Sequence, residues 1–324
     1  MKMKKEYLIL IAVIVALALY LGLRTRDRTH FELPRPAVLE SGAIDRLVIA
    51  RPDGTLELVK KDARWVIEPH GYRADETTVK NMLDQLSSLN LTALVSESER
   101  YERYDLNAEK RINVQAYTGD QKMRDLDVGR PAPTNQHTFV KLAGDPKVYH
   151  ARGSLQNTFD KPLDGLRDKV VLAFERDKLN SIEIRKGAHT TVLAKAAPAP
   201  ANPSDAAAQE KTDSPPPPVE WQAEDGRKAD AAAVDQLLGA MSQLRCDGYI
   251  EQPGDPQEQA WELNFVTEGQ AHRLTLFSKE ENGNRFAARS SDSPYDFWLP
   301  EARVKTFEKQ IDQLLGLEAP KADS

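Results

Sequence analysis

Asp125 and Asp127 are the pair of residues whose types and spacing come closest to a catalytic or metal-binding arrangement. Side chains two positions apart in a strand point to the same face, so the two carboxylates could hold a cation or act in acid/base chemistry. An alternating strand also places polar residues on its solvent face without any chemistry. We therefore interpret the pair as part of a solvated strand face. An enzyme that uses further carboxylates from across the sheet is the alternative.

Other patterns that support catalysis or cofactor binding do not occur in the sequence. The histidines show no HExxH or HxH spacing, which indicates surface or strand-edge positions instead of metal ligands. These histidines are His30, His70, His137, His150, His189 and His272. The absence of P-loop, GxSxG and GxGxxG motifs argues against an ATPase, a serine hydrolase of that type and a dinucleotide enzyme. We predict no catalytic residue, no cofactor and no metal.

Composition narrows the class of protein further. The net charge of −6 leaves no basic field for nucleic acid, and the Lys and Arg residues do not gather into a stripe. The single cysteine, Cys246, lies at the end of an apolar helical stripe, which indicates a buried structural thiol. A chain of 324 residues is long enough for two domains, each with its own core.

An internal repeat organises the sequence. The stretch from Trp65 to Val95 returns as Trp221 to Ile250, and each copy places an Ala-Asp pair before apolar residues at helical spacing. The four tryptophans, Trp65, Trp221, Trp261 and Trp298, could form a platform for sugars. Because Trp65 and Trp221 occupy equivalent positions in the repeat, we interpret them as core residues.

Each copy of the repeat predicts one amphipathic helix. Asp75 and Asp230 stand where an N-cap carboxylate accepts hydrogen bonds from the first free backbone N–H groups of a helix. Apolar residues then recur at i, i+3, i+4 and i+7, which places them on one buried face. They are Val79, Met82, Leu83, Leu86 and Leu89 in the first copy and Val234, Leu237, Leu238, Met241 and Leu244 in the second.

Short alternating segments on both sides of these helices predict strands, so each unit is expected to contain a β-meander, a helix, a second β-meander and a closing helix. The closing helices are predicted at 155–166, broken at Pro162, and at 304–315. The predicted fold is therefore α+β with mainly antiparallel sheets, in two tandem repeat domains at 42–172 and 173–317. The Ala/Pro-rich insertion 196–218 is predicted to be disordered, because it cannot bury enough apolar surface to offset its ordering entropy. Residues 318–324 form a tail.

The N-terminus predicts a membrane anchor. A basic head, 1–6, precedes an uncharged apolar run, 7–23, whose helix would span roughly 26 Å. The run lacks the small residues of a signal-peptide cleavage site, so we predict an uncleaved transmembrane helix followed by a polar tether, 24–41. The expected location is the bacterial inner membrane, single-pass, with the N-terminus cytoplasmic and the bulk of the chain periplasmic.

The order of these features resembles that of a known family. The motifs that carry the resemblance are Trp65-x-x-x-Pro69, Ala74-Asp75, the helix stripe, Tyr104-Asp105-Leu106 and Leu126-x-Val128-Gly129, and the family is the domain-of-unknown-function family numbered 4340. The resemblance covers roughly residues 44–315 as two copies. In that family the tripeptide at 104–106 more often reads Tyr-Gly-Leu, and the second copy has Ile250-Glu251-Gln252-Pro253 in its place.

The resemblance implies a function. Members look like membrane-anchored extracytoplasmic proteins encoded beside ABC-2 type transporter subunits and gliding-motility-like auxiliary proteins. We therefore expect a non-enzymatic, membrane-anchored periplasmic accessory subunit of an ABC-type transporter complex, with the inner membrane and the permease, ATPase and auxiliary subunits as partners. The possible partner-binding loop contains Tyr101, Tyr104, Asp105 and Leu106. The alternative is a cell-wall or polysaccharide-binding scaffold that contacts glycan through Tyr101 or Tyr104.

Overall fold

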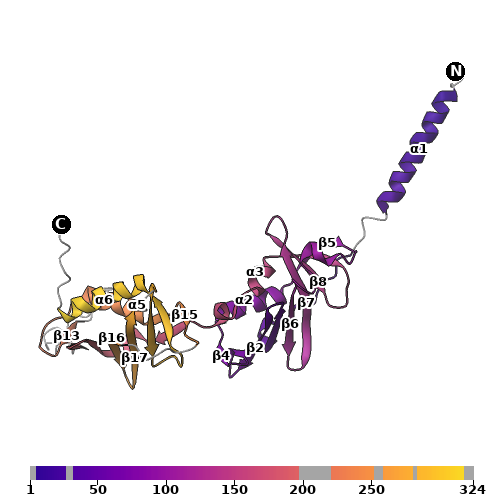
Figure 1. The fold of residues 1–324 in the computed structure, drawn as a ribbon. Helices are drawn as coiled ribbons and strands as arrows, with labels where there is room; N and C mark the ends of the chain where they lie inside the picture. The colour runs from indigo at the N-terminus through magenta and orange to yellow at the C-terminus, as the bar shows by residue number, and fades with distance from the viewer. Residues whose placement is uncertain (1–4, 27–31, 197–219, 252–257, 280–282, 317–324) are drawn as a thin grey trace, which may run out of the picture. The chain divides into compact units, whose positions relative to one another are not determined.

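The chain divides into two compact units, Met1–Asp168 and Lys169–Ser324 (Figure 1). The computed structural model describes residues 5–26, 32–196, 220–251, 258–279 and 283–316. The second unit begins before the predicted position 173, because strand β10 (Val170–Ala173) pairs with β14 (Gln243–Arg245) of that unit. The predicted insertion 196–218, apart from its first residue, lies outside the described residues, as do parts of the head and tether and the tail 318–324.

Helix α1 (Lys5–Arg26) contains the apolar run that predicted a membrane anchor. No helix in the described part of the chain is long and apolar enough to cross a membrane. The predicted transmembrane helix at 7–23 is therefore wrong, and with it the single-pass inner-membrane location with a cytoplasmic N-terminus and periplasmic bulk.

The first unit is built on one nine-stranded antiparallel sheet. Its strands lie side by side in the order β4-β3-β2-β1-β6-β7-β8-β9-β5. The strands are β1 (Arg46–Arg51), β2 (Gly54–Lys61), β3 (Arg64–Glu68), β4 (Tyr72–Arg73), β5 (Leu91–Ser96), β6 (Ile112–Thr118), β7 (Gln121–Pro131), β8 (His137–Leu142) and β9 (Val148–Arg152).

This sheet corrects the predicted fold class. Strand β1 pairs with β6, so the strands before and after the helix form one continuous sheet instead of two separate meanders. The single sheet forms because β5, which follows the helix, lies at the far edge and pairs with β9, whereas the next strand, β6, lies in the centre beside β1. Strands make up most of the regular structure in both units. The prediction of an α+β fold with a transmembrane helix is therefore wrong, whereas the antiparallel pairing is as expected.

Helix α2 (Glu76–Ser87) covers the core face of the first sheet. Its predicted stripe is buried, including Val79 and Met82 at 0% exposure, and packs with strand residues such as Leu47. The side chain of Asp75 accepts a hydrogen bond from the backbone N–H of Thr78 at 2.8 Å, which confirms the predicted N-cap. The closing helix is broken as predicted, into α3 (Leu155–Phe159) and α4 (Leu163–Leu166). The short 3₁₀ helices are η1 (Ser41–Ala43) and η2 (Tyr101–Tyr104).

The second unit repeats this plan. Its eight-stranded antiparallel sheet has the order β13-β12-β11-β16-β17-β18-β19-β15, which reproduces the order β3-β2-β1-β6-β7-β8-β9-β5 of the first. Helices α5 (Ala231–Met241) and α6 (Glu301–Leu315) pack together over its core face (Figure 1). The remaining elements are η3 (Arg176–Lys178), β11 (Leu179–Lys186), β12 (His189–Lys195), β13 (Trp221–Ala223), β15 (Gly248–Tyr249), β16 (Gln259–Thr267), β17 (Gln270–Lys279), β18 (Arg285–Ser290) and β19 (Phe297–Pro300).

The repeated residues have structural roles in the two cores. Trp65 and Trp221 are both 5% exposed, which confirms that they are core residues. The second N-cap is also confirmed, because the side chain of Asp230 accepts a hydrogen bond from the backbone N–H of Ala232 at 2.9 Å. Cys246 is buried, as predicted for a structural thiol.

Candidate functional site

The predicted partner-binding loop lies on the outer face of the first sheet, opposite α2. Tyr101 and Tyr104 begin and end η2 and are half-buried. Asp105 follows with φ 55°, in the left-handed region, and its carboxylate pairs with Lys110 at 3.0 Å. Leu106 is only 1% exposed and belongs to a small apolar cluster with Phe139. The two tyrosines are therefore partly accessible to solvent, whereas Leu106 is buried and holds the loop against the sheet.

Gly129 allows this loop to lie close to the sheet. A Cβ at position 129 would meet the backbone oxygen of Tyr104 at 2.1 Å and the side chain of Leu106 at 3.0 Å. Two motifs that are separate in sequence, Tyr104-Asp105-Leu106 and Leu126-x-Val128-Gly129, are thus in direct contact. The left-handed φ of Asp105 also explains why glycine suits that position, since glycine adopts positive φ without steric cost.

A row of neighbouring rings continues from the loop across β8 and β9. The ring of Tyr104 lies 4.9 Å from that of Phe139, and Phe139 lies 4.8 Å from His150. His150 in turn lies 5.7 Å from His137. The exposed side chain of Arg130 covers Phe139 at 5.2 Å, and its Nε donates a hydrogen bond to the backbone oxygen of Arg103 at 2.8 Å. We call Tyr104, Phe139, His150 and His137 the ring row.

Exposed arginines border the ring row. Arg103 lies in η2, Arg130 lies near the end of β7, and Arg152 is the cross-strand partner of His137. In the described part of the chain none of the three guanidinium groups forms an ion pair. Apart from the Nε of Arg130, their N–H donors are therefore available to another molecule.

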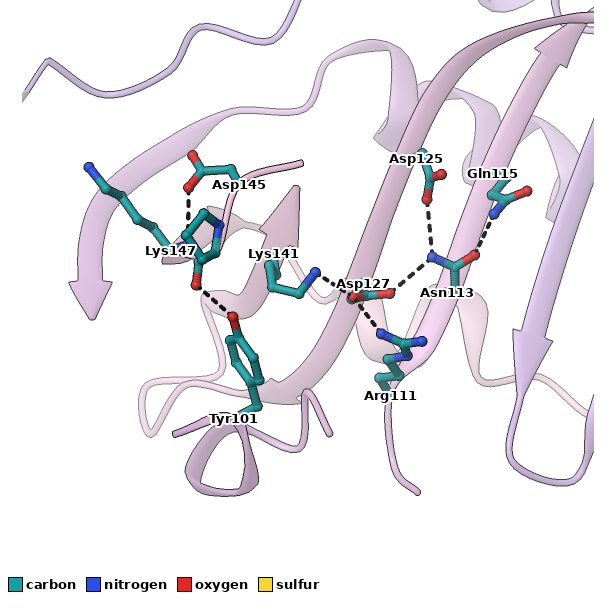
Figure 2. Close-up of polar contacts among 10 residues, drawn as sticks. Tyr101, Arg111, Asn113, Gln115, Asp125, Asp127, Lys141, Asp145 and Lys147 are labelled. Carbon is teal, nitrogen blue, oxygen red and sulfur yellow. Dashed lines mark hydrogen bonds and ion pairs between the residues drawn. The ribbon is translucent and has the colours of Figure 1, made fainter. Parts of the chain in front are cut away.

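Tyr101 connects the loop to the turn between β8 and β9. Its hydroxyl donates a hydrogen bond to the backbone oxygen of Pro146 at 3.0 Å (Figure 2). The Nζ of Lys141 lies 5.9 Å from the centre of the Tyr101 ring, within range of a cation–π contact. Both contacts hold the ring against the protein, so Tyr101 helps to fix the position of the loop.

The carboxylates of Asp125 and Asp127 belong to a polar network on the same outer face (Figure 2). Asp127 is 4% exposed and pairs with Lys141 at 2.9 Å and Arg111 at 3.1 Å. The Nδ2 of Asn113 donates hydrogen bonds to both aspartates, at 2.9 Å to Asp127 and 3.1 Å to Asp125. This burial contradicts the interpretation of the whole pair as a solvated face.

Both charges of this pair are therefore neutralised within the protein. Asp125 pairs with Lys122 at 2.7 Å, while Asp127 pairs with Arg111, just before β6, and with Lys141 of β8. Sequence reasoning missed Arg111, Asn113 and Lys141, because pairing across three strands brings them to the carboxylates. Among the residues that the structure describes, no group of three or more His, Cys, Asp or Glu side chains could hold a metal ion.

The structure also brings together histidines that are distant in sequence. His137 and His150 meet across β8 and β9, and in the second unit the Nδ1 of His272 lies 2.8 Å from the carboxylate of Asp292. Asp292 also accepts a hydrogen bond from the backbone N–H of Ala173 at 3.1 Å. Spacing in the sequence shows neither pair, since both depend on strand register. The His272–Asp292 pair links β10 to the large sheet, which is a structural role.

The environment of His150 makes the first unit sensitive to acid. Burial, followed by the neighbouring His137, lowers the pKa of His150 from its ordinary value of 6.5, and its Nε2 is buried without a hydrogen-bond partner. A lowered folded-state pKa contributes stability that is present above the unfolded pKa and is lost as pH falls through the folded pKa. We therefore expect the first unit to lose stability as pH falls below 6.5.

Hydrogen exchange of β8 and β9 between pH 7 and pH 5 measures this loss. His150→Phe keeps an aromatic ring in the row and removes the titration, so its stability is expected to change less over this range. His70→Phe, at an exposed position of the same unit, is the control and is expected to behave as the parent. Equal pH dependence in the two variants would show that His150 does not cause the effect.

The fold and this outer face define a tandem antiparallel β-sheet protein with a loop-covered surface in its first unit. The chain belongs to the family described as Domain of unknown function (DUF4340), whose model matches residues 65–262. This match lies within the range 44–315 of the expected resemblance and confirms the family. Searches of curated proteins and of solved structures found no significant match.

Proposed function

We propose that this protein is a non-enzymatic module that binds a partner protein through the loop 101–106 and the ring row. One observation carries the proposal: half-buried rings beside the buried Phe139 and exposed arginines without ion pairs to the described residues lie together on one face, next to a buried and internally neutralised polar network. Aromatic and arginine side chains are enriched in protein interfaces. Lys141 of that network lies 5.9 Å from the ring centre of Tyr101 in the loop.

The same geometry favours a protein over a glycan as the partner. The ring of Tyr104 packs on Phe139, and Tyr101 is held by its hydroxyl and by Lys141. A platform for sugars needs an open aromatic face, and these rings use much of their surface within the protein. The family resemblance suggests ABC-2 type permease and ATPase subunits, or their auxiliary proteins, as the partner class to examine first.

Crosslinking to named candidate subunits tests this proposal. The full chain, carrying a photoreactive amino acid at the exposed position Glu102, is incubated with detergent-extracted permease and ATPase subunits, and crosslinked products are identified by mass spectrometry. We expect a specific product whose yield falls at least tenfold in the double variant Arg103→Ala/Arg130→Ala. Arg64→Ala, an exposed arginine of β3 in the same unit, is the matched control and is expected to keep the yield. Equal yields in both variants, or no product with any candidate, would count against the proposal.

A further inference from the structure

A pocket of about 470 Å³ lies on the outer face of the sheet of the second unit. Its walls include Asn264 of β16, Arg273, Thr275 and Phe277 of β17, and Arg289 of β18. These β16 and β17 positions alternate with buried core residues, which places them on the face away from α5 and α6. Sequence reasoning assigned no role to this surface.

The equivalent outer face of the first unit includes a row whose charged side chains all pair with an opposite charge. There, Asn113, Asp127 and Lys141 form one cross-strand row, and every charge has a partner. The corresponding row of the second unit is Glu262, Thr275 and Arg289, which is also balanced. Glu262 lies 3.7 Å from Arg185 and accepts a hydrogen bond from Thr275, while Arg289 forms two hydrogen bonds to Asp296, at 2.7 and 2.8 Å.

The neighbouring row in the second unit, Asn264 and Arg273, contains a charge that is not paired with an opposite charge among the described residues. Arg273 is the cross-strand partner of Asn264, and no carboxylate of the described residues forms an ion pair with it. In the first unit the equivalent row contains Gln115 and Asp125, whose charge is neutralised by Lys122. The second unit therefore replaces a neutralised carboxylate with a guanidinium group that has no counter-ion among the described residues.

Asn264 adds a second group without a partner at the same place. Its Oδ1 is buried without a hydrogen bond, and its side-chain amide makes none to any described residue. Buried polar groups in native proteins are normally hydrogen-bonded, so an amide of this kind beside an open pocket indicates a missing partner. Phe277 supplies an apolar wall, and the guanidinium carbon of Arg289 lies 5.6 Å from its ring centre.

We propose that this pocket binds a peptide segment that carries a carboxylate. The carboxylate pairs with Arg273, a carbonyl oxygen of the peptide accepts a hydrogen bond from the Nδ2 of Asn264, and an apolar side chain of the peptide packs on Phe277. A monoanion fits better than a phosphate dianion, because the carboxylates of Glu262 and Asp296 bond to Thr275 and Arg289 of the adjacent row and oppose excess negative charge. The site lies in the second unit and does not depend on the function proposed for the loop 101–106.

Peptide titrations followed by NMR of the full chain test the proposal. Two probes separate the possible sources of the carboxylate: acetyl-Ala-Leu-Asp-amide carries it on a side chain, and acetyl-Ala-Ala-Leu with a free C-terminus carries it on the main chain. Their uncharged counterparts contain Asn or a C-terminal amide. We expect saturable shifts of the Thr275 and Phe277 amides with at least one charged probe, and at least tenfold weaker binding of its uncharged counterpart.

Matched variants locate the binding group. Arg273→Gln is expected to weaken binding at least tenfold, whereas Arg185→Gln, an exposed arginine of β11 that already pairs with Glu183 and Glu262, is expected to leave it within twofold. Unchanged near-ultraviolet circular dichroism shows that both variants are folded. Absence of saturable binding by either charged probe, equal effects of the two variants, or tighter binding of inorganic phosphate than of the peptides would overturn the proposal.

Discussion

Gly129→Ala is expected to lower the free energy of unfolding of the first unit by about 3 kcal/mol, near the upper end of what overpacking costs. The added Cβ would meet the backbone oxygen of Tyr104 at 2.1 Å, and a backbone atom cannot rotate away as a flexible side chain can. The clash forces either the loop 101–106 or strand β7 to move. In both cases Leu106 loses its buried position beside Phe139.

Hydrogen exchange of the full chain measures this effect separately in each unit. We expect faster exchange in residues 101–106 and in β7 and β8, with the second unit unchanged. Gly42→Ala is the matched control, because a Cβ there meets nothing within 4 Å, and its effect is expected to stay within about 0.5 kcal/mol. If exchange at 101–106 were the same in the two variants, the close approach of Gly129 would not hold the loop.

Asp127→Ala is expected to destabilise the first unit by about 2 to 3 kcal/mol. Removing one partner of a buried ion pair leaves the other charge uncompensated and costs about 3 to 5 kcal/mol. We expect a cost at or below the low end of this range, because the side chain of Arg111 is 42% exposed and can be hydrated by water once Asp127 is removed. The side chain of Lys141 is 18% exposed and can be hydrated less. Asn113 also loses one of its two carboxylate acceptors.

A comparison with Asp125→Ala isolates the effect of burial. Asp125 sits two residues away in the same strand and pairs with the more exposed Lys122, so its removal is expected to cost less than about 1 kcal/mol. Denaturant unfolding followed by exchange of β6 and β7 gives both values. A double-mutant cycle with Lys141→Ala should show a coupling energy of at least about 1 kcal/mol. Equal costs for the two aspartates, or no coupling, would mean that the pairs around Asp127 do not stabilise the sheet.

The duplicated fold explains why the two outer faces differ. Both units share one strand order and bury the apolar faces of their helices against the sheet, so their cores are constrained in the same way. The outer faces do not pack against these helices, so their side chains can differ between the two units. In the first unit a loop and a neutralised polar network cover β7 and β8. In the second unit the equivalent strands line a pocket with an arginine that forms no ion pair in the described part of the chain.

Local features of the fold could be predicted from the sequence. The stripe from Val79 to Leu86, the N-caps Asp75 and Asp230, and the break at Pro162 depend on residues within a few positions of each other. Hydrogen bonds and side-chain contacts at that spacing form wherever the helix forms, so the pattern alone specifies them. The family could be predicted for a related reason, since its motifs are short and local.

The candidate sites could not be predicted in the same way. Asp127 looked like a solvent-facing residue because alternation shows which face a side chain occupies and not what covers that face. The partners Arg111 and Lys141 come from neighbouring strands, and the sequence contains no signal of that register. Arg273 and Asn264 likewise become a pair only through the pairing of β16 with β17.

The sequence by itself determined the helices, their caps, the duplication and the family, because these depend on contacts within one element or on order along the chain. The tertiary structure alone decided that β1 joins β6 in one sheet and that Gly129 meets the loop at Tyr104. It also decided which outer-face charges are matched. Long-range strand pairing sets all three, and the energy of each contact depends on burial that exists only after the sheet has formed.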